Sequence, residues 1–212
     1  MDFDKKNKVG TSRESAFSRI EKMHPFMMML YLSMMGIGIL FLMLTIAYVQ
    51  SSAVDTDATK FTFPRFFSIS TILLLISGYT ISKTNRSYKK DNLNKLKKYF
   101  LFTILLGVGF VLSQLSGWYE ISSNGISFRG LATGTYIYLI SALHAVHLIG
   151  GFIFLSFMYF KTQQAANDPI RTLLFIRNPF VQQQIRMLGI YWHFMDGLWV
   201  FLYLVFLFTM KS

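Results

Sequence analysis

The sequence contains no cysteine among its 212 residues and only four prolines. Without cysteine the chain can form neither a disulfide nor a thiolate metal site, so functions that need either are excluded. Acidic residues are also few, ten against 21 lysines and arginines, which gives a formal net charge of +11. Apolar side chains, by contrast, make up 53% of the residues. This balance is typical of a lipid-embedded protein and predicts an all-α membrane domain.

Five apolar windows are long enough, or nearly so, to cross a bilayer. A hydrocarbon core about 30 Å thick requires roughly 20 apolar residues in a helix. The windows cover residues 26–49, 66–82, 99–118, 133–160 and 185–209. They predict a polytopic bundle of five transmembrane helices, in which residues 1–24 form a cytoplasmic tail and residues 25–212 form one membrane domain. The first window is too long for a signal-peptide core, so we expect it to be retained.

The second window is the most polar of the five, because hydroxyl side chains interrupt it throughout. They are Ser68, Ser70, Thr71, Ser77, Thr80 and Ser82. A hydroxyl in a membrane helix can bond back to its own helix or across to a neighbour, so we expect this span to pack against protein. Small residues in the other windows predict close approach of the backbones. They are Gly36, Gly38, Gly107, Gly109, Gly134, Ala142, Ala145, Gly150 and Gly151.

The basic residues lie between the apolar windows rather than in one soluble patch, which argues against nucleic acid as a partner. They cluster before the first window, between the second and third, and between the fourth and fifth. Because basic flanks stay in the cytoplasm, the N-terminus is predicted inside and the C-terminus outside. The opposite side carries only Lys60, Arg65, Arg129 and Lys211. The candidates for contact with anionic lipid headgroups are Arg86, Lys97, Lys98 and Arg186.

Two further segments fit surface positions on the inner side. Thr11 to Glu14 form a capping-box pattern followed by apolar residues at helical spacing, which fits a short interfacial helix or a partly disordered tail equally well. Residues 167–184 contain two Asx-Pro pairs around an apolar stretch. That pattern predicts a second surface helix or a contact with a partner.

Ionisable groups are rare within the windows, and each one is costly in lipid. His144 and His147 lie in the fourth window, and His193 and Asp196 lie in the fifth. Each pair is spaced i, i+3, so its two members share one helix face. Glu120 ends the third window, with the neutral Gln114 nearby.

Three interpretations of these groups compete. Converging imidazoles could bind a metal or a haem, and carboxylates with histidines could relay protons. The favoured interpretation is that the histidines and the aspartate form hydrogen bonds across the third, fourth and fifth helices and fix their register.

Two segments resemble subunit III of the haem-copper terminal oxidases, in its short five-helix bacterial form. They are HAVHLIGG from His144 and YWHFMDGLWVFLY from Tyr191. QLSGWYE from Gln114 is similar to the family's ending of the preceding helix. The matching positions are Gln114, Glu120, His144, His147, Gly150, Tyr191, Trp192, His193, Asp196 and Trp199. Two positions depart from the family: Met34 replaces an acid in the first span, and Gly117 replaces a glutamate.

The resemblance implies a chain of the bacterial inner membrane with no catalytic, metal-binding or cofactor-binding residue of its own. The oxidase as a whole would reduce oxygen to water and pump protons, with its haem and copper in partner subunits. The implied partners are the catalytic subunit I, other oxidase subunits and phospholipid. The implied role is to stabilise the catalytic subunit, hold lipid and support proton uptake.

Three alternatives to the oxidase remain. A subunit-III-like component of a nitric oxide reductase would share the same motifs. An independent di-haem cytochrome would use His144, His147 and His193 as ligands. A small transporter should show repeats and broken helices, and neither is evident in the sequence.

Overall fold

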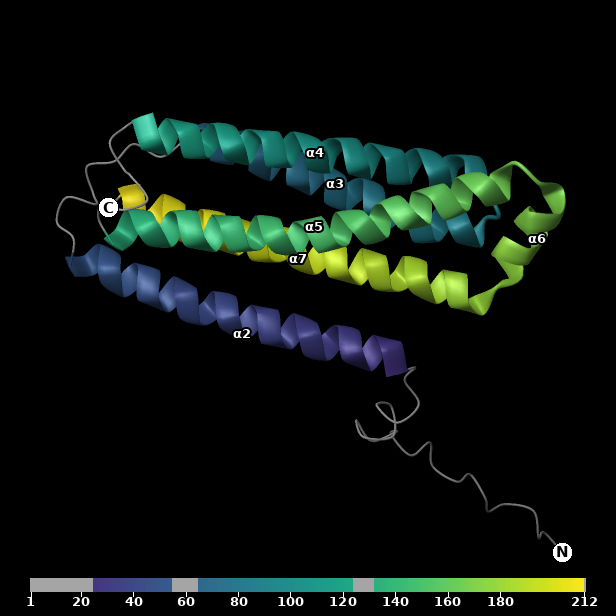
Figure 1. The fold of residues 1–212 in the computed structure, drawn as a ribbon, viewed down its shortest axis with the longest axis horizontal. Coiled ribbons are helices and arrows are strands. Elements are labelled where there is room, and N and C mark those ends of the chain that lie inside the picture. Colours follow the sequence, from purple (N-terminus) through teal and green to yellow (C-terminus); the bar gives the residue numbers. More distant parts are fainter. Residues whose placement is uncertain (1–24, 55–64, 124–131, 212) are drawn as a thin grey trace, which may run out of the picture.

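In a computed structural model, the structure describes residues 25–54, 65–123 and 132–211, which contain six α-helices and no strand (Figure 1). The helices are α2 (Pro25–Val54), α3 (Arg65–Lys89), α4 (Leu93–Ser123), α5 (Ala132–Ala166), α6 (Pro169–Arg177) and α7 (Pro179–Lys211). All of them except α6 are long and apolar enough to cross a membrane. The predicted all-α bundle with five spans is therefore confirmed. The segment from Thr11 to Glu14 lies outside the described residues.

The helices continue beyond the apolar windows that predicted them. α3 runs past residue 82 to Lys89, and α4 starts at Leu93 rather than at residue 99. Hydropathy marks only the hydrocarbon core, whereas a helix can run on through the headgroup layer. Between these two helices Asp91 adopts a left-handed conformation with φ of 54°, and Asn92 Oδ1 accepts a hydrogen bond from the Lys95 amide at 3.0 Å. These two residues form a short turn that makes α3 and α4 antiparallel.

Two Asx-Pro pairs define α6, as the sequence predicted for residues 167–184. Asp168 Oδ1 accepts from the Ile170 amide, and Asn178 Oδ1 accepts from the Phe180 amide, both at 2.9 Å. The proline that follows each cap needs no amide partner at the first helical position. The predicted surface helix is thus confirmed for Pro169–Arg177, while residues from Pro179 onward belong to the fifth span.

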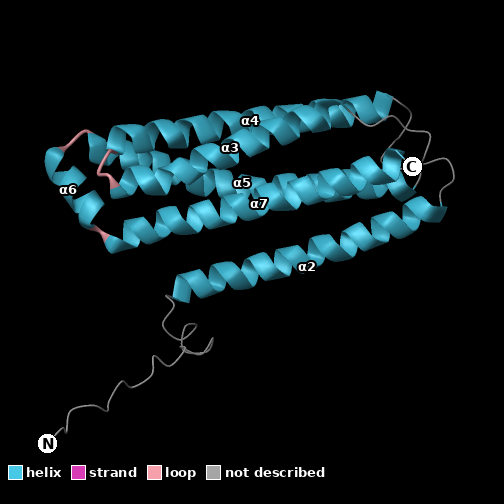
Figure 2. Cartoon of the chain, turned by 180° about the vertical axis from the view of Figure 1, so that it is seen from behind, coloured by secondary structure: helices cyan, strands magenta, loops and turns pink. Residues whose placement is uncertain are grey.

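The helices form three layers, seen from the front in Figure 1 and from behind in Figure 2. α3 and α4 pair along their length on one side, α5 and α7 lie in the middle, and α2 packs against α5 and α7 on the other side. α6 crosses one end of the bundle, where α5 ends and α7 begins. α3, the most polar span, therefore lies against α4 and α7, which confirms the expectation that it packs against protein.

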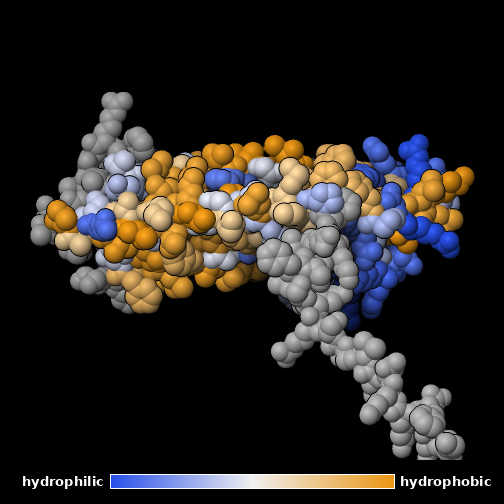
Figure 3. Space-filling model, turned by 90° about the horizontal axis from the view of Figure 1, so that it is seen from below, coloured by the Kyte–Doolittle hydropathy of each residue, from blue (hydrophilic) through white to orange (hydrophobic). Residues whose placement is uncertain are grey.

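The molecular surface separates into an apolar middle and a hydrophilic end (Figure 3). The hydrophilic end corresponds to the end of the bundle that carries the α3–α4 turn and α6. Most of the described basic residues belong to the chain segments that meet there. That this end faces the cytoplasm stays a prediction.

Glycines differ in whether they bring helices together. A Cβ atom added at Gly117 would lie 2.6 Å from the ring of Phe67, which is buried. At Gly36 and Gly150 a Cβ would meet no atom within 4 Å. The expected close approach is therefore wrong for Gly36 and Gly150, whereas Gly117, which the sequence marked only as a departure from the family, makes room for an aromatic ring.

We expect Gly117→Ala to lower the free energy of unfolding by about 1–3 kcal/mol, because the Phe67 ring has little space in which to move. Gly36→Ala is the matched control and should be neutral or stabilising by up to about 1 kcal/mol, since alanine favours a helix and its methyl group is unopposed. Thermal unfolding in detergent, followed by tryptophan fluorescence, measures both. Equal stability of the two variants would contradict the packing described for Gly117.

Candidate functional site: polar contacts between the helices

The hydroxyls of α3 accept hydrogen bonds from two tryptophans of α7. Trp192 Nε1 donates to Ser77 Oγ, and Trp199 Nε1 donates to Thr71 Oγ1, each at 3.1 Å. Both indole rings are fully buried. The two bonds lie about two helical turns apart on antiparallel helices, so together they fix the register of α7 against α3.

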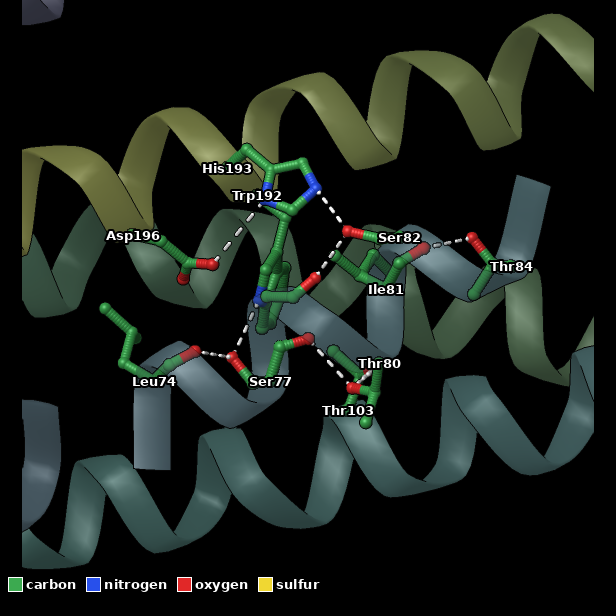
Figure 4. A network of polar contacts seen from close by, with 11 residues as sticks. Leu74, Ser77, Thr80, Ile81, Ser82, Thr84, Thr103, Trp192, His193 and Asp196 are labelled. Carbon is green, nitrogen blue, oxygen red and sulfur yellow. Dashed lines mark hydrogen bonds and ion pairs between the residues drawn. The ribbon is translucent and has the colours of Figure 1, made fainter. Parts of the chain in front are cut away.

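Each hydroxyl also donates a hydrogen bond within its own helix, so it acts as both donor and acceptor. Ser77 Oγ donates to Leu74 O and Thr71 Oγ1 donates to Phe67 O, both at 2.8 Å. The hydroxyl proton is thus used within α3, and a lone pair remains for the indole N–H (Figure 4, for Ser77). A buried indole N–H has therefore found an acceptor without leaving another group unbonded.

α4 is tied to α3 in the same way. Gln114 Nε2 donates to Ser70 Oγ at 2.8 Å, and the hydroxyls of Thr80 and Thr103 lie 2.7 Å apart. Ser113 Oγ donates to Phe66 O at 2.9 Å. α3 therefore presents hydroxyls to two neighbours at once, which accounts for its window being the most polar of the five.

His193 contacts α3, which is the second span. The prediction had placed its partner on the third or fourth span, which are α4 and α5. Its Nε2 lies 2.9 Å from Ser82 Oγ, and Ser82 Oγ in turn lies 2.9 Å from Gly78 O (Figure 4). Asp196 Oδ2 lies 3.9 Å from Nδ1 of the same imidazole. Gly78 makes room for this pair, because a Cβ there would overlap the Asp196 carboxylate. The predicted cross-helix bond thus exists for His193, but with a different helix.

His144 forms no hydrogen bond with any described residue. It is fully buried, and its ring lies 5.2 Å from the Trp199 ring, 5.8 Å from Phe110 and 6.3 Å from Phe41, measured between centroids. The predicted cross-helix hydrogen bond is wrong for His144, because the helices that face it offer aromatic rings instead of polar groups. A haem at this position would have to displace those rings.

His147 also differs from the prediction. Its Nδ1 lies 2.8 Å from Leu143 O in its own helix, while its backbone oxygen accepts from Tyr191 Oη at 2.7 Å. The bond between α5 and α7 at this level is therefore made by the backbone, not by the imidazole. Among the described residues, no three His, Asp or Glu side chains group closely enough to hold a metal ion.

The remaining predicted residues lie in several places. Glu120 Oε2 at the end of α4 is buried and has no hydrogen-bond partner among the described residues, and Gly150 is exposed. Arg86, Lys98 and Arg186 are exposed and Lys97 is half-buried. The headgroup contacts proposed for these four stay a prediction.

Several contacts were not anticipated from the sequence, and two of them join helices at opposite ends of the bundle. Trp118 Nε1 donates to Ser141 Oγ at 2.9 Å, which joins α4 to α5. Tyr88 Oη lies 2.9 to 3.1 Å from three carbonyl oxygens at the C-terminal end of α6 and just beyond it. Such carbonyls have no partner within a helix, and the single hydroxyl proton of Tyr88 lies within reach of all three. The only signal in the sequence was a tyrosine at the charged end of a span.

We expect Thr71→Val to lower the free energy of unfolding by about 1–3 kcal/mol, because valine keeps the shape but leaves the buried Trp199 indole without an acceptor. Thr71→Ser keeps the hydroxyl and should lose less. Ser116→Ala, at a hydroxyl of α4 whose one bond among the described residues is to its own Leu112 carbonyl, is the matched control. The indole resonance of Trp199 in a ¹⁵N–¹H spectrum should shift in the valine variant alone. An unshifted resonance would refute the bond.

Comparison with known proteins agrees with these motifs. A family model described as "Cytochrome c oxidase subunit III" matches residues 19–210. A "Probable cytochrome c oxidase subunit 3" of Mycobacterium leprae is 27% identical over 135 residues, which are 64% of this chain and 62% of the relative. The human "Cytochrome c oxidase subunit 3" is 31% identical over 138 residues, 64% of this chain and 47% of the relative. The chain therefore spans less than two thirds of the length of these relatives, and it belongs to the cytochrome c oxidase subunit III family.

Proposed function

We propose that the chain is subunit III of a proton-pumping haem-copper terminal oxidase in a bacterial inner membrane. In this role it binds no haem or copper itself, packs beside the catalytic subunit I, holds lipid and supports proton uptake at the inner surface. The observation that carries the proposal is that side chains of the family motif in α7 form hydrogen bonds to another helix. Trp192 and Trp199 bond to hydroxyls of α3, so the motif fits a scaffold.

The other motif histidines support a scaffold as well. His144 is enclosed by aromatic rings, and His147 is bonded within its own helix. His193 is bonded to Ser82 on α3. A redox centre needs ligands that converge on one position, whereas these three side chains are engaged in three different environments. The geometry therefore favours a subunit whose partners carry the redox chemistry.

Two surface features support the binding of lipid. Exposed basic side chains at the hydrophilic end of the bundle could each attract an anionic headgroup by about 1 kcal/mol. An apolar groove of about 240 Å³ lies between α2, α5 and α7, and its lining includes Leu30, Gly150, Gly151, Phe154, Met187 and Tyr191. Because Gly150 presents no side chain there, the groove has room for part of an acyl chain.

Purification of the chain in mild detergent tests the assignment directly. We expect it to bring down a catalytic subunit that contains both haem and copper, detected by absorption spectra, metal analysis and mass spectrometry of the bound chains. A matched preparation from cells lacking the affinity tag is the control. Recovery of a haem and non-haem iron subunit without copper would replace the oxidase by a nitric oxide reductase.

Deletion of the chain tests its role within the oxidase. We expect the first turnovers to proceed, because the redox centres lie elsewhere, and activity then to decay over fewer turnovers than in the complete enzyme. Proton uptake from the inner side should also slow. Oxygen consumption and the pH change of reconstituted vesicles measure the two effects. Unchanged lifetime and unchanged uptake would reject the proposed role while leaving family membership intact.

A further inference from the structure

Three large apolar side chains of α6 are exposed at the hydrophilic end of the bundle. Ile170, Leu173 and Leu174 are 71%, 61% and 68% exposed, and their spacing puts them on one helix face, here called the α6 patch. In Figure 3 apolar side chains reappear at the right-hand end of the molecule, where α6 lies, beyond the hydrophilic ones. The α6 patch is therefore separated from the apolar band that faces lipid.

The opposite face of α6 is held firmly against the bundle. Phe175 is buried with its ring 5.9 Å from the Tyr88 ring, and Tyr88 Oη lies 2.9 Å from Phe175 O and 3.0 Å from Ile176 O. Thr172 Oγ1 donates to Ala165 O at 2.7 Å. Rotating α6 to bury its patch would break these contacts, so the outward direction of the patch is built into the fold.

The surroundings of the α6 patch are positively charged. Arg171, Arg177 and Lys161 lie on or beside α6. Two acids lie near them: Asp168 is 3.5 Å from Arg171, and Asp91 lines a neighbouring pocket with Thr172. Lys161 Nζ donates to the neutral Gln184 Oε1, so its charge is not neutralised by that bond. A pocket of about 250 Å³ adjoins the patch, and its lining includes Lys161, Arg171, Leu174, Phe175 and Val181. Cations thus stand beside an apolar floor, which complements a segment that carries both a carboxylate and an apolar side chain.

We propose that the α6 patch and this pocket dock a water-exposed acidic segment of a neighbouring polypeptide. The segment places an apolar side chain against Leu173 and Leu174 and a carboxylate beside Lys161 and Arg171. This inference rests on the proposed function in one respect, namely that the chain is one subunit of a complex. Exposed apolar patches with a polar rim mark interaction sites, and the position beyond the basic side chains favours a protein over the bilayer.

A photo-crosslinker tests the proposal in native membranes that contain the whole complex. p-Benzoylphenylalanine replaces Leu174, and in a control strain it replaces Phe157, which is exposed within the apolar part of α5. Position 174 should attach to an acidic peptide of another polypeptide, identified by mass spectrometry, whereas position 157 should attach to lipid or to an apolar helix. The double variant Arg171→Glu, Arg177→Glu should reduce the yield at position 174 several-fold. Lys95→Glu, which reverses an exposed charge on α4, should leave the yield unchanged.

Three results would overturn the proposal. Position 174 could attach to lipid only, which would make α6 a bilayer-bound helix. It could attach only to this same chain, or it could fail to react while position 157 reacts. An undiminished crosslinking yield in the double variant would also reject the proposed contact between a carboxylate and the basic side chains. The outcome is separable from the proposed function. A complex that contains the haem-copper subunit but gives lipid adducts rejects the docking site alone. An acidic adduct in a complex without that subunit rejects the oxidase alone.

Discussion

The hydrogen bonds between tryptophans of α7 and hydroxyls of α3 are the constraint on which the arrangement of the bundle depends. In a bilayer the lipid is as apolar as the side chains, so burial of leucine does not by itself select one helix neighbour over another. An indole N–H without an acceptor, however, is costly in that environment. Trp192 and Trp199 find their acceptors in Ser77 and Thr71, which lie opposite them. The hydroxyl side chains of α3 therefore determine which helices it packs against, whereas its apolar side chains determine that it crosses the membrane.

The sequence predicted the spans well and their polar contacts less well, for one physical reason. Hydropathy and spacing are properties of a single helix, and they correctly gave five spans and a second span packed against protein. A hydrogen bond needs a second helix, whose rotation the sequence does not reveal. His144 and His147 share a face as their spacing required, yet that face meets rings such as Phe41. His193 faces outward enough to reach Ser82, a partner on a helix that the prediction had not considered.

The same limit explains which residues were overlooked. Tyr88 matters because the chain returns past it at α6, more than eighty residues later. Gly117 matters because Phe67 of another helix occupies the space that a side chain would need. Neither has a signature in its own segment. Asp168 and Asn178, by contrast, cap helices through bonds to residues two positions away, so the pattern of Asx followed by proline indicated α6 as one of two alternatives, the other being a contact with a partner.

α2 shows the opposite case to α3. It is the most hydropathic span and the least buried. The hydroxyls of Ser33, Thr45 and Ser52 bond to carbonyls of α2 itself. Its contacts with α5 and α7 include ring contacts, such as Phe41 with His147 and Tyr48 with Phe206. Ring contacts tolerate sliding better than hydrogen bonds do, because dispersion forces lack a fixed direction. The register of α2 is therefore fixed less strictly by these contacts than that of α3 and α7, which cannot shift without breaking the bonds of two buried indoles.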